Sequence, residues 1–222
     1  MPNWCHFDMI VAGRRENVDL FCQVLRNNYD KTHMFRIHDT EVDSVEDYGL
    51  YRRVRLNGDC AWSVYCCMLP GESTYFNDMI MEVSNPPHPR HDPYLYYEGP
   101  ATNLLILSKQ LELDIAIRSE ESGMAFCELY HIKNGERLTD KVGEFNELYF
   151  GDGESWEELQ ELYGQWGASR FTKEEYDEAK ARGEQTIIHQ TFTDEHLMEI
   201  APPAKPVFKE YQRLYKVVGE QK

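Results

Sequence analysis

The sequence predicts an α+β fold in which an antiparallel sheet is covered by helices on one face only. One observation is the alternation within residues 58–68, where one set of positions is apolar: Cys60, Trp62, Val64, Cys66 and Met68. Alternation places the two sets on opposite faces of a strand, so this segment is expected to be a central strand packed on one side. The other observation is the order of strand-like and helix-like segments along residues 1–150.

The first predicted elements are a strand, a helix and a hairpin. Residues 5–11 alternate as a strand, and a helix follows with a single apolar stripe at Val18, Phe21, Cys22 and Leu25. A strand at 51–56 is followed by Asn57-Gly58, a dipeptide that favours a two-residue hairpin turn leading into the central strand.

The second half of the core repeats this order. Residues 73–83 have helical spacing, residues 84–100 form a proline-broken loop, and a further helix begins after Thr102 or Asn103. Strands are predicted at 113–118, 125–132 and 145–150. Strand, helix, strand, strand, helix, strand is the split βαβ pattern of the ferredoxin-like fold, which places two helices on one face of the sheet.

Residues 151–222 are predicted to form an acidic, mainly helical extension packed on the 1–150 core. Two capping boxes start helices at Ser155 and Thr172, residues 185–192 are a candidate strand, and Pro206 begins a last helix. The unpaired edge near residues 145–150 could pair with a second copy, unless the extension covers it. The oligomeric state itself is not predicted.

Composition excludes several classes of protein. The chain has 222 residues and a formal net charge of -16, whereas a protein that binds nucleic acid directly needs a basic face. No apolar run is long enough for a membrane helix, and the first residues lack the basic and apolar regions of a signal peptide. We therefore expect a cytoplasmic protein of a bacterial cell, with its six cysteines reduced.

The cysteines favour core packing over metal binding. The sequence has no CxxC or HxxxH pair, and the adjacent Cys66 and Cys67 point to opposite faces of a strand. A composite zinc site of Cys5, Cys66 and Cys127 is the alternative. No cofactor is predicted, because nucleotide-binding and nucleophile-elbow motifs are also absent.

One loop carries a second candidate site. Residues 84–100 contain His88, Arg90, His91 and Asp92, which could hold a phosphate or act in acid–base chemistry. Solvated polar residues in a proline-rich loop explain the same pattern. The alternative reading of the chain is therefore a small-ligand binder or an enzyme that uses this loop.

An acidic run supplies the candidate surface for partner binding: Asp39, Glu41, Asp43, Glu46 and Asp47. In an extended segment these carboxylates could occupy the basic groove of a nucleic-acid-handling protein, although loop solvation explains them equally well.

Three segments resemble the YubB-type ferredoxin-like proteins of phages and plasmids. The opening Met1-Pro2-Asn3-Trp4-Cys5 resembles the start of that family, residues 113–126 resemble its strand–SEE-x-G–strand element, and residues 58–63 fit its central strand. His6-Phe7-Asp8 departs from the Asn that usually follows the opening. The resemblance covers residues 1–150 and implies the fold and a mobile-element origin, without an activity.

These observations predict a non-enzymatic accessory protein of a phage or other mobile element. It is expected to act through protein–protein binding, with a host nucleic-acid-handling or defence complex, such as a CRISPR-type complex, as the target of its acidic face.

Overall fold

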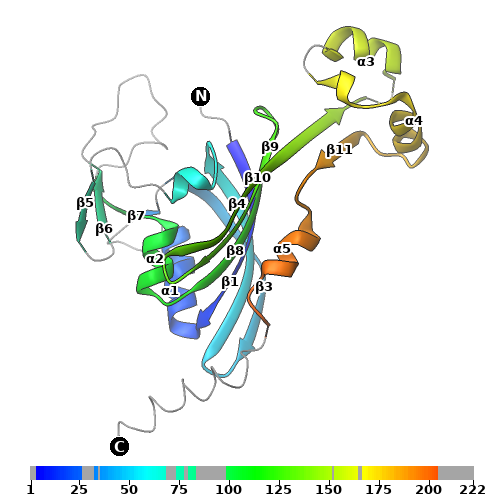
Figure 1. Ribbon diagram of the computed structural model, residues 1–222. Coiled ribbons are helices and arrows are strands. Elements are labelled where there is room, and N and C mark those ends of the chain that lie inside the picture. The colour runs from blue at the N-terminus through cyan, green and yellow to red at the C-terminus, as the bar shows by residue number, and fades with distance from the viewer. Residues whose placement is uncertain are drawn as a thin grey trace, which may run out of the picture.

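The computed structural model describes residues 4–26, 33–34, 36–68, 74–77, 80–83, 99–151, 153–164 and 167–204. Its main element is a seven-stranded antiparallel sheet in the order β11-β10-β9-β8-β1-β4-β3. The sheet curls, with α1 and α2 against its concave face and α5 on the convex face (Figure 1).

The strands of the large sheet differ greatly in length. Their bounds are β1 Trp4–Arg14, β3 Ile37–Tyr48, β4 Tyr51–Ala61, β8 Asp114–Glu121, β9 Phe126–Lys133, β10 Glu136–Tyr149 and β11 Thr186–Gln190. A smaller sheet has the order β2-β7-β6-β5. Its strands are β2 His33–Met34, β5 Thr74–Asn77, β6 Ile80–Val83 and β7 Gly99–Thr102.

The helices are short. Their bounds are α1 Arg15–Leu25, α2 Leu104–Gln110, α3 Trp156–Tyr163, α4 Lys173–Ala181 and α5 Asp194–Ile200, with 3-10 turns η1 Tyr65–Cys67 and η4 Ala168–Arg170.

The largest core lies on the concave face. The apolar stripe predicted for α1 is confirmed, since Val18, Phe21 and Leu25 are buried against the same face of β1 as Phe7 and Met9. Burying each of these side chains contributes about 1.5–3 kcal/mol. The predicted start of α2 is confirmed too, because the Asn103 side chain accepts a 2.9 Å hydrogen bond from the backbone N–H of Ile106 and caps the helix.

The predicted ferredoxin-like fold is wrong. Instead of a small sheet with two covering helices, the chain builds a sheet-dominated, curled half-barrel. The sheet extends through β9 and the 14-residue β10 to β11. Strand twist accumulates over seven strands, and this accumulation curls the sheet.

The predicted Asn57-Gly58 hairpin is also wrong. Strand β4 runs without a break from Tyr51 to Ala61, and the turn to β3 lies at Gly49, whose φ is 65°, and Leu50. Gly58 serves packing instead, because a Cβ there would lie 2.9 Å from the Phe7 ring and from the Thr40 methyl group.

The central strand predicted over residues 58–68 is formed only as far as Ala61, where β4 ends. The chain leaves β4 at Trp62, whose φ of 76° is rare for a bulky residue, and then forms η1. Val64 and Cys67 are buried by this turn, while Trp62 is half exposed. The helix predicted over 73–83 is wrong as well, since β5 and β6 lie there.

The C-terminal third forms an arm and a strap. The arm comprises residues 153–164 and 167–183, with α3, η4 and α4, and Figure 1 shows it beyond the end of the large sheet. Both predicted capping boxes are present, as is the strand predicted over 185–192. The strap is α5, which returns to the convex face. The helix predicted from Pro206 lies outside the described residues.

Candidate functional site

A polar hollow lies where the arm meets the sheet. This neck hollow has a volume of about 490 Å³ and is open to solvent. Its lining comes from strands β10 and β11, turn η4 and the residue that follows β11, and consists of Glu144, Asn146, Arg170, His189, Gln190 and Thr191. Since the lining is polar and carries both signs of charge, the neck hollow is suited to a polar group on the surface of a partner.

Contacts within the neck hollow join the arm to the two-stranded ribbon of β10 and β11. The Arg170 guanidinium donates to the side-chain oxygen of Asn146. His189 Nε2 lies 2.8 Å from Glu175 Oε1, and its ring packs on Phe171 at a centroid distance of 4.6 Å. Hydrogen bonds from the backbone N–H and the hydroxyl of Thr172 lower the pKa of the Glu175 carboxyl, and His189 lowers it further. Glu175 therefore stays anionic and holds the arm on β11.

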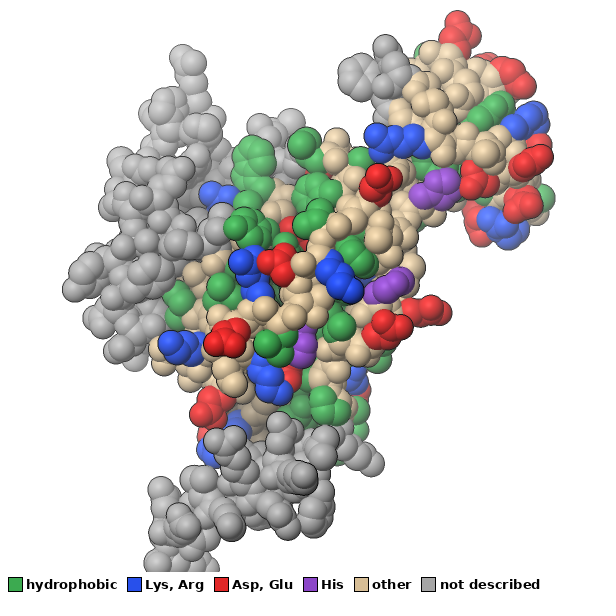
Figure 2. Space-filling view, viewed as in Figure 1, with side chains coloured by type: hydrophobic (Ala, Val, Ile, Leu, Met, Phe, Trp, Pro, Cys, Tyr) green, Lys and Arg blue, Asp and Glu red, His purple; other side chains and the backbone are tan. Residues whose placement is uncertain are grey.

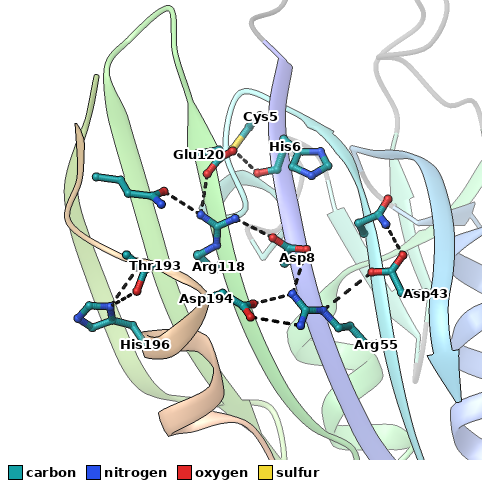
Figure 3. A network of polar contacts seen from close by, with 12 residues as sticks. Cys5, His6, Asp8, Asp43, Arg55, Arg118, Glu120, Thr193, Asp194 and His196 are labelled. Atoms are coloured by element: carbon teal, nitrogen blue, oxygen red, sulfur yellow. Dashed lines mark hydrogen bonds and ion pairs between the residues drawn. The ribbon is translucent and has the colours of Figure 1, made fainter. Parts of the chain in front are cut away.

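A charged network crosses the convex face beside the neck hollow (Figure 3). Arg118 on β8 donates to Glu120 at 2.7 Å, to Asp8 at 2.7 Å and to Gln190 at 2.9 Å. Gln190 also lines the neck hollow, so the two features are continuous.

The same network fastens the strap. Arg55 on β4 lies 3.7 Å from Asp8 and 2.6 Å from Asp194, the first residue of α5. Figure 3 shows Asp8 between Arg55 and Arg118. Below the charges, Leu197 is fully buried against Ile10.

The charge of Arg118 is stabilised despite its burial. Its side chain is only 12% exposed. Burial opposes the charged form, but the hydrogen bond that Arg118 donates to Asp8 and the charge of Glu120 outweigh it, so the pKa of Arg118 is raised. Removing one partner of a buried pair leaves the other charge uncompensated, which makes this network a structural clasp.

The predicted acidic surface is largely matched by arginines across the β3–β4 hairpin. Glu46 pairs with Arg53 at 2.8 Å, and Asp47 with Arg52 at 2.7 Å. The remaining candidates lie further along β3. Asp43 accepts from Asn57 and lies 3.9 Å from Arg55, while Asp39 and Glu41 are exposed and have no ion pair among the described residues.

The other predicted site residues are not brought together. His88, Arg90, His91 and Asp92 lie outside the described residues, so the loop site stays a prediction. Cys5 packs in the concave core, whereas Cys127 packs in a separate cluster with Phe145 and donates to the Glu144 carbonyl at 3.2 Å. Cys66 is half-buried on η1. The alternative zinc site of Cys5, Cys66 and Cys127 is therefore wrong, because its members lie in different clusters.

A buried carboxylate beneath η1 escaped prediction. Glu128 is 3% exposed and accepts hydrogen bonds of 2.9 Å from the Val64 N–H, the Ser119 hydroxyl and the Tyr130 hydroxyl. Burial raises its pKa, against the opposing effect of these donors. In the sequence, Glu128 is only a single charged residue within a predicted strand. Whether such a residue points inward or outward cannot be determined without the register of the sheet.

Three buried thiols lie near this carboxylate. A hydrogen bond with Cys60 and burial raise the pKa of Cys5, and Cys60 in turn contacts Cys67. Within the described residues, no group of three or more His, Cys, Asp or Glu side chains is arranged to hold a metal ion. The raised pKa values keep the thiols of Cys5 and Cys60 neutral, and their full burial agrees with the packing role predicted for them.

Comparison with known proteins gives no relative: no family model, curated protein or solved structure matches the chain. The resemblance to the YubB-type proteins stays a prediction, and the expected phage origin gains no support. No helix in the described part of the chain is long and apolar enough to cross a membrane.

Proposed function

We propose that this protein is a non-enzymatic binding protein that engages a basic surface of a protein partner through its acidic arm. The observation that carries the proposal is the outer side of α3. Leu162 and Tyr163 are 57% and 46% exposed there, and Glu157 and Glu161 are exposed beside them. Exposed aromatic and aliphatic side chains with a charged surround are typical of interface anchors.

The arm presents this surface on a preformed scaffold. Leu159 on α3 is fully buried against Phe150 and Tyr176, and the Tyr176 hydroxyl donates to the backbone carbonyl of Glu154. The two capping boxes satisfy backbone donors at the starts of α3 and α4. A preorganised surface loses little conformational entropy on binding, so more of its contact energy remains as affinity.

Several carboxylates of the arm already have hydrogen-bonding or ionic partners within the arm. Glu158 and Glu175 serve the capping boxes, and Asp177 pairs with Lys173 at 2.7 Å. Glu157, Glu161 and Glu174 are exposed and have no ion pair among the described residues. Figure 2 shows acidic side chains over the arm, with basic ones between them. The three carboxylates free of such pairs define the charge that a partner would meet.

The charge pattern supports a basic target. A net charge of -16 attracts a basic partner over long range and repels nucleic acid, so the partner is a protein. A nucleic-acid-handling or defence complex of the host has such a basic groove, and the proposed role is occupation of that groove. The β3 hairpin is a weaker candidate for the contact, because Arg52 and Arg53 neutralise its inner carboxylates.

The test compares two charge reversals of equal size. Tagged wild-type protein is used to capture a stoichiometric partner from bacterial lysate, and the purified pair is then reconstituted. Glu157→Lys/Glu161→Lys/Glu174→Lys should abolish the complex, whereas Asp39→Lys/Glu41→Lys/Asp43→Lys should retain it. Capture of no stoichiometric partner, or survival of the complex in the arm variant, would contradict the proposal.

A further inference from the structure

Strand β10 has an open edge over the first part of its length. It pairs with β9 over residues 136–144, but β11 pairs only with residues 145–149. No other described strand lies on the outer side of residues 136–144. Leu138, Asp140, Lys141 and Val142 are all exposed there. We propose that this edge binds an extended segment of a partner protein, which adds to the sheet as a strand.

Thr191 shows which backbone groups face the open side. It donates its N–H to the Glu144 carbonyl at 2.9 Å, and its hydroxyl accepts from the Glu144 N–H at 2.9 Å. Both polar groups of Glu144 thus point away from β9, while the Phe145 N–H points to the carbonyl of Ala125 at the start of β9. Backbone groups alternate along an antiparallel strand, so the N–H and C=O of Val142 and Asp140 point to the open edge as well.

Thr191 also marks the point along β10 at which β11 stops covering the edge. A Cβ at Gly143 would lie 2.4 Å from the Thr191 Cβ, so glycine lets the two chains approach closely at this point. Beyond it, β11 gives way to α5, and the lateral position beside Val142 and Asp140 is left to another strand. The incoming segment would therefore lie end to end with β11.

Side chains beside the edge select the sequence of the partner. Val142 lies opposite Glu128 and Asp140 opposite Tyr130, so both side chains are on the concave face. Val142 is 66% exposed, and Tyr65 lies near the same strand with its ring under Arg137 at 5.2 Å. Figure 2 shows hydrophobic side chains gathered on the body of the molecule. An apolar residue opposite Val142 and a basic residue two positions on, opposite Asp140, fit this face.

A second copy of the chain fits poorly. In an antiparallel dimer, two identical edges pair about a twofold axis. An axis at Asp140 would place the two Asp140 carboxylates opposite each other, and an axis at Lys141 would place the two Lys141 ammonium groups opposite each other. Centring on Val142 places Glu144 opposite Asp140, and the Glu144 edge is already bonded to Thr191. The occupant is therefore a different protein, with alternating apolar and basic residues.

The probe is the peptide acetyl-VTKT-amide, whose valine and lysine share one face of a strand and which ends before the Glu144 position that Thr191 occupies. Hydrogen exchange of the backbone amides is followed by NMR, with and without about 2 mM peptide, a concentration matched to millimolar affinity. The peptide should slow exchange at Val142 and Asp140 about threefold, the most that about 2 mM peptide allows at a dissociation constant of about 1 mM, because paired edge amides are protected. Unchanged exchange at both amides would overturn the proposal, as would equal slowing along β3.

Three variants sharpen the test. Val142→Pro removes an N–H that faces outward, so the β9 ladder survives while peptide protection should be lost. Val142→Lys should also lose it, and Val45→Lys, an exposed valine on the edge strand β3, should keep it. If Val142→Pro does not fold, the test is decided by comparing Val142→Lys with Val45→Lys. Protection in Val142→Lys equal to that of the wild type would overturn the proposal.

Two controls separate this inference from the alternatives. The arm variant Glu157→Lys/Glu161→Lys/Glu174→Lys should bind the peptide as the wild type does, so failure of the proposed arm contact leaves this inference standing. A dimer in sedimentation velocity whose Val142 and Asp140 amides are protected without peptide would overturn it in favour of self-association.

Discussion

The Glu128 carboxylate accepts a 2.9 Å hydrogen bond from the backbone N–H of Val64 and thereby ties η1 to the large sheet. Ser119 and Tyr130 bind the same carboxylate from the sheet side. A single buried charge therefore joins the chain after β4 to strands β8 and β9, and its protonation affects stability.

Replacing Glu128 with Gln should remove a pH-dependent destabilisation. The folded-state pKa of Glu128 is raised by burial, so the folded protein binds its proton more tightly than the unfolded chain does. The proton on Glu128 therefore contributes to the free energy of unfolding in full below the ordinary pKa of glutamate. This contribution is lost as the pH rises through the higher pKa that Glu128 has in the folded protein. Each unit of pKa difference corresponds to about 1.4 kcal/mol. In urea unfolding from pH 4 to 8, the variant should gain stability relative to wild type as pH rises, whereas a constant difference would contradict the assignment.

Glu128→Ala should destabilise the protein at every pH. It leaves the donors of Val64, Ser119 and Tyr130 buried without their acceptor, at a cost of about 1–3 kcal/mol for each unsatisfied group. Glu136→Ala is the matched control, since that side chain is exposed. Equal midpoints for the two variants in thermal unfolding would show that the Glu128 contacts contribute little.

The strap should depend more on packing than on its ion pair. Leu197 is fully buried, so Leu197→Ala is expected to cost about 2–5 kcal/mol. Asp194 is 53% exposed where it meets Arg55, so Asp194→Asn should cost less than about 1 kcal/mol. Hydrogen exchange of the α5 amides measures both effects, and a larger effect from Asp194→Asn would reverse this ranking.

Gly58 should be intolerant of a side chain for a steric reason. A Cβ there meets Phe7 and Thr40 at 2.9 Å, so Gly58→Ala is expected to cost about 1–3 kcal/mol through overpacking. Gly153 has no heavy atom within 4 Å of a Cβ position, and Gly153→Ala should change stability by about 0.5 kcal/mol or less. Denaturant midpoints of the two variants would coincide if Gly58 were only a flexible link.

Truncation of the arm anchors should affect binding and not folding. Leu162 and Tyr163 are about half exposed, so Leu162→Ala/Tyr163→Ala should leave the melting temperature near that of the wild type. The same variant should weaken the partner complex of the proposed function at least about tenfold, as loss of an interface anchor does. Titration calorimetry with the purified partner checks this, and unchanged affinity would remove α3 from the interface.

Local patterns predicted α1 to α4 but not α5, placed a helix over 73–83 where β5 and β6 lie, and predicted the strand connections poorly. The 3.6-residue spacing of Val18, Phe21 and Leu25 belongs to one element, so it could be read without knowledge of the fold. The alternation over 60–68 looked the same whether the chain stayed in a strand or turned at Trp62 into η1, because both arrangements bury Val64 and Met68. Asn57-Gly58 was misread since the need for glycine came from Phe7, a contact with a distant residue.

Prediction of the candidate site residues depended even more on the register of the strands. The acidic run on β3 was visible in the sequence, but its neutralisation by Arg52 and Arg53 follows from a turn at Gly49 that propensity did not favour. The open edge of β10 depends on the point at which Thr191 stops β11. A single sequence contains no direct signal for such distant pairings.

The two strands that meet the arm also decide how it responds to force, because β10 leads into the arm after Tyr149 and β11 leaves it at Thr186. A load drawing the arm along the strand axis pulls both backbones in the same direction and does not shear the five residue pairs between them. A load that draws β11 sideways from β10 opens those pairs one after another instead, so the attachment of the arm is stiff along the strands and weak across them.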